Sequence, residues 1–285
     1  MRRMRRRHLE RSCSGWVAWG GGRGGVQRLR AWFAGAAFAR HRHDTYAIGV
    51  TDTGVQSFWY RGTSHSSVHG DVVVLHPDEV HDGYAGTSEG FGYRILYIDP
   101  ARVSDACRAI AGRATALPFV RKPVVRSNRL ASLIDAAFAM QLEPLGADAI
   151  IFALAEALLA EVRQRARVPA RLDHLAVDRA KQLLDNATQR LVHSSELERA
   201  SGLSRFELSR QFKSMVGTSP YRYSVMRRLE WARRRIGTQP MAQVALEAAF
   251  ADQAHFTRAF KAAFGMPPGR YVKLSAALPA LPSIS

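Results

Sequence analysis

The stretch VALEAAFADQAHFTRAFK, residues 244–261, decides the fold of the carboxyl-terminal third of this 285-residue chain. Apolar residues three or four positions apart predict a short helix through Val244 and Ala248 and a second helix that ends near Phe264. Asp252 is suited to cap the second helix at its amino end, and Gly265 is suited to close it. A short helix, a tight turn and a second helix with a polar amino-terminal face are typical of a helix-turn-helix motif.

A second copy of this motif lies 48 residues earlier. Its first helix passes through Leu197 and Ala200, Gly202 interrupts it, and Ser204 can cap a helix that runs to Val216. The identical pairs are Arg210 and Arg258, Phe212 and Phe260, Lys213 and Lys261, Gly217 and Gly265, Pro220 and Pro268, and Tyr223 and Tyr271. Six identities at one offset indicate an internal duplication. The sequence between the copies, 223–236, predicts one helix that holds both motifs rigidly.

The second helix of each copy divides into an apolar stripe and a polar face. The stripes, which we expect to be buried, are Leu208, Phe212 and Met215 in the first copy and Phe256, Phe260 and Phe264 in the second. The candidate base-reading residues are Arg205, Phe206, Ser209 and Arg210 in the first copy and Gln253, His255, Thr257 and Arg258 in the second. Lys213 and Lys261 lie one turn further on, where a phosphate contact is expected. The sequence therefore predicts a double-stranded DNA reader with two helices about one helical turn of DNA apart.

The distribution of charge agrees with a DNA-binding carboxyl-terminal part. The formal net charge of +17 divides into +8 for residues 1–30, zero for 31–170 and +9 for 171–285. The two cysteines, Cys13 and Cys107, have no metal-binding spacing, which argues against a disulfide scaffold and a zinc finger and favours a reducing compartment. No apolar run is long enough for a membrane span. We therefore expect a cytoplasmic protein without a membrane partner.

The carboxyl-terminal third resembles the AraC/XylS family of transcription regulators. The resemblance rests on residues 244–261 with Gly265 and Pro268, and on residues 202–213 for the first motif. Three positions depart from the family pattern: Ala249 replaces the turn glycine, Pro267 a threonine or serine, and Glu198 a small packing residue. Ala249 is expected to strain a turn that needs positive φ. Glu198 is expected either to disturb a helix contact or to form a capping box with Ser195.

Residues 26–100 have a different pattern, with short β-rich runs separated by glycine-containing turns. These runs predict an all-β barrel or sandwich. The segments 41–46 and 70–82 also resemble the cupin-type sensor barrel of the same family. Two apolar helical segments follow, at 127–142 and 148–167, and they can either cover the barrel or join two subunits.

Three histidines mark the candidate ligand site of the barrel. In metal-binding cupins, the histidines at the positions of His41, His43 and His81 are metal ligands together with a glutamate a few residues after His43. Here Ala47 and Ile48 occupy the region of that glutamate, so the carboxylate is missing. Three neutral imidazoles could still hold a transition metal, line a pocket for an anionic or hydroxylated molecule, or be structural. We expect no metal, no cofactor and no catalytic residue. The candidate ligand-binding residues are His41, His43, Tyr46, His81 and Tyr93.

These observations predict a multidomain α and β protein. The expected parts are a basic leader at 1–25 without fixed structure, a cupin-like sensor barrel at 26–100, a helical dimerisation and linker region at 101–168, a double helix-turn-helix domain at 171–275 and a flexible tail at 276–285. The resemblance implies a non-enzymatic transcription regulator that binds promoter DNA and a small-molecule effector, forms a homodimer and has RNA polymerase as a candidate partner. The alternative is a metal-dependent, dioxygenase-like cupin enzyme fused to a DNA-binding domain.

Overall fold

Ten strands and ten helices follow one another in the computed structural model, which describes residues 14–113, 115–162 and 172–276. The first 13 residues of the predicted leader, residues 163–168 of the expected dimerisation and linker region, and the tail from 277 lie outside the described residues. The strands are β1 (Ser14–Arg23), β2 (Val26–Ala34), β3 (Ala36–His41), β4 (Tyr46–Gly54), β5 (Gln56–Tyr60), β6 (Thr63–Ser67), β7 (Val72–Leu75), β8 (His81–Ala85), β9 (Phe91–Ile98) and β10 (Val124–Val125).

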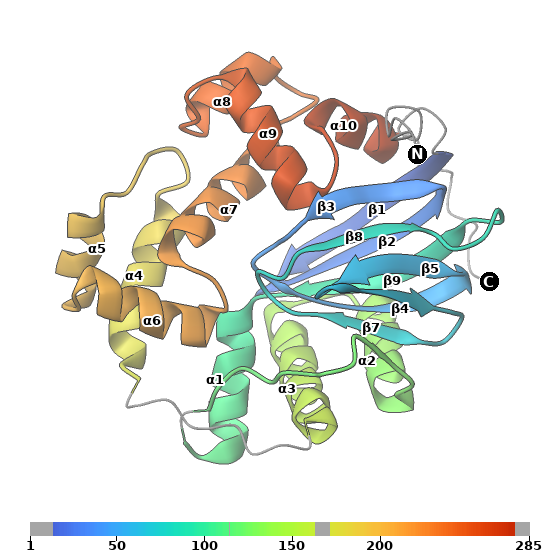
Figure 1. The fold of residues 1–285 in the computed structure, drawn as a ribbon. Helices are drawn as coiled ribbons and strands as arrows, with labels where there is room; N and C mark the ends of the chain where they lie inside the picture. Colours follow the sequence, from blue (N-terminus) through green and yellow to red (C-terminus); the bar gives the residue numbers. More distant parts are fainter. Residues whose placement is uncertain (1–13, 114, 163–171, 277–285) are drawn as a thin grey trace, which may run out of the picture.

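The strands form two antiparallel sheets, in the orders β1-β2-β9-β4-β7-β10 and β3-β8-β5-β6 (Figure 1). Alternating residues of β2 and β9 point into a shared core that includes Leu29, Phe33 and Phe91. The amino-terminal part is therefore the cupin-like β domain that the sequence predicts, made of two sheets and not of one closed barrel.

Strand β1 is a correction to the sequence analysis, which predicts no structure before about residue 26. It pairs with β2 along Trp16↔Trp32 and Val17↔Ala31. The glycines at its end discourage a regular strand on propensity alone. The side chains beside them outweigh this preference, because Val17 is buried in the core and the ring of Trp19 stacks on Tyr97, 5.7 Å away.

Three helices, α1 (Pro100–Ala111), α2 (Asn128–Ala139) and α3 (Pro144–Glu161), lie against the sheet of β4, β7 and β9 (Figure 1). They form one core with that sheet, in which Ile48 and Leu96 meet Ile134 and Leu154. Helix α3 starts four residues earlier than predicted because Pro144 is at a first-turn position, where proline is tolerated.

The carboxyl-terminal part contains α4 (His174–Asn186), α5 (Ser194–Ser201), α6 (Arg205–Val216), α7 (Pro220–Arg233), α8 (Met241–Glu247), α9 (Gln253–Phe264) and α10 (Pro268–Ala276). Helices α5 and α6 form the first helix-turn-helix, and α8 and α9 form the second. Helix α7 contributes Tyr223 to the core of the first unit and Leu229 to the core of the second. One helix therefore joins both motifs, as predicted.

The two departures Glu198 and Ala249 have defined local roles. Glu198 does not form a capping box with Ser195, because its Oε1 accepts from the backbone N–H of Arg205, 2.8 Å away, at the start of α6. Ala249 has a φ of 55°, the left-handed value that the missing turn glycine predicts. The buried Arg228 guanidinium donates to the carbonyls of Ala248 and Ala249 at 2.8 and 2.6 Å and so holds this turn.

The second helix-turn-helix contacts the edge of a sheet. The backbone N–H groups of Ala39 and Arg42 donate to the carbonyls of Gly265 and Ala262, at the carboxyl end of α9. Strand β3 can make these contacts because it is the edge strand of its sheet. The segment that begins with β3 therefore contributes to the core of the β domain and also contacts the end of α9.

Candidate functional site

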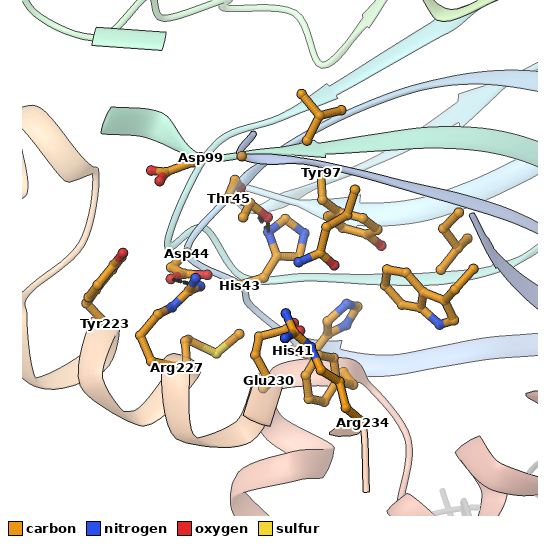
Figure 2. A pocket seen from close by; sticks show the side chains of 18 of the residues that line it. His41, His43, Asp44, Thr45, Tyr97, Asp99, Tyr223, Arg227, Glu230 and Arg234 are labelled. Atoms are coloured by element: carbon orange, nitrogen blue, oxygen red, sulfur yellow. Dashed lines mark hydrogen bonds and ion pairs between the residues drawn. The ribbon is translucent and has the colours of Figure 1, made fainter. Parts of the chain in front are cut away.

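A cavity of about 260 Å³ lies between the β domain and the helices α7 and α9 (Figure 2). Figure 2 shows Thr45, His43 and Tyr97 on the β side and Arg227, Glu230 and Arg234 along α7 opposite. The apolar lining includes Val17, Trp19, Leu29, Phe38 and Tyr97 from the β domain and Met226, Ala263, Phe264, Met266 and Tyr271 from the helical part. We call this cavity the interdomain pocket.

His41, His43 and His81 come together beside this pocket. The ring centroids of His41 and His43 lie 4.2 and 4.8 Å from that of His81. Each Nδ1 atom is about 3 Å from a backbone carbonyl oxygen, namely Ala39 for His41, Thr45 for His43 and Glu79 for His81. A carbonyl can only accept, so each Nδ1 carries the proton.

The three imidazoles are neutral near pH 7. Burial, with the nearby His81, lowers the pKa of His43 to about 3. Burial also lowers the pKa of His81 to about 4, and burial together with His81 and His43 lowers that of His41 well below its ordinary range. The cluster therefore presents neutral rings whose Nε2 atoms bear lone pairs.

An ion pair crosses the interdomain pocket from one domain to the other. Arg227 Nη2 of α7 donates to Asp44 Oδ2 at 2.8 Å, and the Asp44 side chain is 4% exposed. Burial raises the pKa of the Asp44 carboxyl, and the Arg227 guanidinium acts against that rise. Two further ion pairs, Lys181–Asp99 and Arg233–Glu230, involve acidic residues that line the interdomain pocket. Arg233 also donates to the Gln27 side chain. The boundary between the two domains therefore has polar contacts around the apolar part of the interdomain pocket.

The structure separates the predicted ligand-binding residues. His41 and His43 line the interdomain pocket, and His81 packs against both rings. Tyr46 lies elsewhere, where its hydroxyl donates to the Pro118 carbonyl beside a second, smaller cavity. Tyr93 is buried in the sheet core against Phe91.

The amino-acid sequence alone does not indicate which residues of the helical domain line the interdomain pocket. The most prominent are Met226, Arg227, Glu230, Arg234 and Tyr271. The arginines of α7 are visible in the sequence as a basic run, but nothing there distinguishes one that faces the β domain from one that faces solvent. The same holds for Trp19, which belongs to strand β1, a strand that the sequence does not predict.

The described residues contain no group of three or more histidine, cysteine or acidic side chains arranged to hold a metal ion. Ala47 and Ile48, at the place where a metal-binding cupin would have its glutamate, are buried in β4.

Most of the predicted DNA-reading side chains are exposed on α6 and α9. Phe206 is 81% exposed at the first turn of α6, next to Arg205, which pairs with Glu198. The other exposed residues of the set are Ser209, Arg210, Lys213, Gln253, His255 and Arg258, while Thr257 and Lys261 are half-buried. Docking onto the β domain therefore leaves the predicted reading faces accessible.

Two helix-turn-helix units with exposed faces on α6 and α9, joined to a β domain with a cavity at their boundary, are typical of a DNA-binding regulator with a ligand-binding domain. Comparison with known families agrees: residues 23–162 match the AraC-like ligand binding domain and residues 197–274 match a helix-turn-helix domain. The chain belongs to the AraC family of transcriptional regulators. No described helix has the length and apolar character needed to cross a membrane.

Individual relatives extend over most of the chain. The transcriptional activator RhaS of Yersinia pestis is 26% identical over 82% of this chain and 88% of its own, and the regulator YbfI of Bacillus subtilis is 24% identical over 76% and 81%. The match to the probable regulator LumQ of Photobacterium leiognathi is 31% identical but spans only 36% of that protein. Among solved structures, ToxT of Vibrio cholerae has the same fold, with a TM-score of 0.60 at 11% identity over 93% of this chain and 99% of its own. Another ToxT structure has an unsaturated fatty acid bound.

Proposed function

We propose that a small amphiphilic acid binds in the interdomain pocket and thereby controls how this regulator binds promoter DNA. The observation that carries the proposal is that both domains line one cavity, so an occupant touches the β domain and α7 together. An effector changes DNA affinity only if it binds two arrangements of the domains differently. A ligand between the domains meets that requirement directly. The fatty acid bound to ToxT supports an apolar acid as the ligand class.

The proposed DNA contacts are those expected from the sequence. Arg205, Phe206, Ser209, Arg210, Gln253, His255, Thr257 and Arg258 would read bases, and Lys213 and Lys261 would contact phosphates. The proposal assigns no catalytic role and no cofactor. It includes a cytoplasmic homodimer, supported by the exposed Leu145 and Phe152 on one side of α3, and RNA polymerase as a candidate partner on the promoter.

The pocket can be tested by filling it. Met226 is buried at the pocket, so Met226→Trp should remove space, whereas Ala242→Trp places the same ring on the exposed side of α8. Full-length wild type and both variants are screened by thermal shift against small organic acids. We expect acids that raise the Tm of the wild type and of Ala242→Trp but not of Met226→Trp. Equal stabilisation of all three proteins would move the ligand out of this pocket.

A further inference from the structure

Three buried polar atoms at the interdomain pocket have no hydrogen-bond partner among the described residues. They are His43 Nε2, Trp19 Nε1 and Arg227 Nε. A buried polar atom without a partner costs free energy, and native proteins contain few of them. Three around one cavity indicate the polar groups that an occupant would supply.

The chemistry of His43 Nε2 is the most restrictive. His43 is 6% exposed, and its Nδ1–H donates to the Thr45 carbonyl at 2.9 Å, so Nε2 holds a lone pair and can only accept. The ring neighbours of His43, Tyr97 and His81, meet it edge-on without a hydrogen bond to this atom. A carboxylate, which has no proton to give, would be repelled there. A hydroxyl group can donate.

Trp19 Nε1 and Arg227 Nε require a hydrogen-bond acceptor instead. The indole Nε1–H of Trp19 and the Nε–H of Arg227 can only donate. Trp19 stacks on Tyr97, the same ring that His43 contacts from 5.2 Å. A hydroxyl group both donates and accepts, so it is the simplest group that satisfies a lone pair and an N–H in one pocket.

The charges of the pocket add a second requirement. Its three acidic side chains each have a basic partner, in the pairs Asp44–Arg227, Asp99–Lys181 and Glu230–Arg233. Arg234, which also lines the pocket from the end of α7, has no acidic partner among the described residues (Figure 2). The charge left over at the rim is therefore positive.

We propose that the pocket recognises a hydroxylated carboxylic acid with an apolar body, its hydroxyl donating to His43 Nε2 and its carboxylate lying at Arg234. This inference rests on the proposed function and narrows it, because an apolar acid without a hydroxyl leaves His43 Nε2 unpaired. The apolar body would pack against Trp19, Tyr97 and Phe264, which also line the cavity.

The test uses matched acids on the full-length protein. The probes are decanoic acid, 3-hydroxydecanoic acid, 10-hydroxydecanoic acid and the methyl ether of the last, 10-methoxydecanoic acid, with affinities measured by calorimetry. A hydrogen bond that rescues a buried acceptor is worth roughly a factor of ten in Kd. We expect one hydroxy acid to bind about tenfold more tightly than decanoic acid, and the methoxy acid, which cannot donate, to bind no better than decanoic acid.

Variants assign the two ends of the ligand. His43→Phe keeps a ring but removes the acceptor, so the hydroxy acid and decanoic acid should bind it equally. Arg234→Gln should weaken both acids several-fold and leave their ratio unchanged, whereas the exposed control Arg199→Gln on α5 should change neither.

The outcomes distinguish a failure of the hydroxyl assignment from a failure of the proposed function of the pocket. Equal wild-type affinities for decanoic acid and both hydroxy acids would overturn the hydroxyl assignment and leave the pocket as an acid site. A tenfold preference that persists in His43→Phe would overturn the role of His43. If none of the acids binds, the proposed function of the pocket fails together with this inference.

Discussion

Arg227 Nη2 lies 2.8 Å from Asp44 Oδ2, and this pair joins helix α7 to the loop between β3 and β4 across 183 residues of sequence. Asp44 is almost fully buried, and the guanidinium of Arg227 also lies over the ring of Tyr223, 4.7 Å away. The contact thus connects the helix shared by both DNA-binding units with the segment that carries His43. A ligand in the interdomain pocket would lie beside this ion pair.

The first prediction concerns the stability of this pair. Arg227→Met leaves a buried carboxylate without its partner, which should lower the free energy of unfolding by about 3 kcal/mol. The double variant Asp44→Asn with Arg227→Met should recover most of the loss. Arg222→Met is the matched control. Its partner Asp78 also pairs with Arg42, so this carboxylate keeps one basic partner when Arg222 is replaced. The free energy of unfolding should fall by less than about 1 kcal/mol. Chemical denaturation of the full chain measures all three, and equal losses for Arg227→Met and Arg222→Met would contradict the account.

A second prediction is a loss of stability on acidification. Because the pKa of His43 is lowered to about 3 in the folded chain, the unfolded chain takes up a proton first as the pH falls below about 6.5. The contribution of His43 is fully present above that pH and declines by about 2 kcal/mol by pH 5. Unfolding curves at pH 7.5 and pH 5 should differ less for His43→Phe than for the wild type. The same pH dependence in both proteins would refute the neutral, buried state of His43.

The turn of the second helix-turn-helix offers a stabilising substitution. Ala249 has positive φ, which costs a residue with a Cβ roughly 1 kcal/mol or more compared with glycine. Ala249→Gly removes this cost, but glycine loses more entropy on folding, which offsets part of the gain. The substitution should therefore raise the free energy of unfolding by about 0.5–1 kcal/mol. The control Ala136→Gly, on the exposed face of α2, should lower it by about 1 kcal/mol. A loss of stability in Ala249→Gly would show that the turn is not strained.

DNA affinity should separate base reading from phosphate contact. Replacing Arg210 or Arg258 by alanine should cost about 1–3 kcal/mol on the preferred operator and relax the preference at one base pair. Lys213→Ala should weaken operator and random DNA alike and reduce the salt dependence. Operators selected from random DNA provide the assay. If Arg258→Ala weakened both DNAs equally, Arg258 would be a phosphate contact.

The parts of the fold that local sequence determines were predictable. The bounds of α6 and α9 follow from the caps Ser204 and Asp252 and from Gly217 and Gly265, each of which acts within one turn of its helix. Strand β1 was not predictable, because its stability comes from pairing with β2 and from the Trp19–Tyr97 stack and not from its own glycine-rich sequence.

The candidate site was predictable only on its β side. His41 and His43 lie two residues apart, so their common location could be inferred from sequence. Arg227 and Arg228 are adjacent, yet Arg227 pairs with Asp44 and Arg228 holds the turn at Ala249. Which neighbour faces which domain depends on how α7 docks, and a helical pattern does not contain that information.

Operator affinity with and without a pocket ligand tests the central claim most directly. The full chain is titrated with its selected operator in the absence of ligand and at saturation with the decanoic acid derivative that binds most tightly. The account predicts a ligand-dependent change of about 5–150-fold in the wild type and none in Met226→Trp. An unchanged operator affinity in the wild type at full occupancy of the interdomain pocket would contradict it.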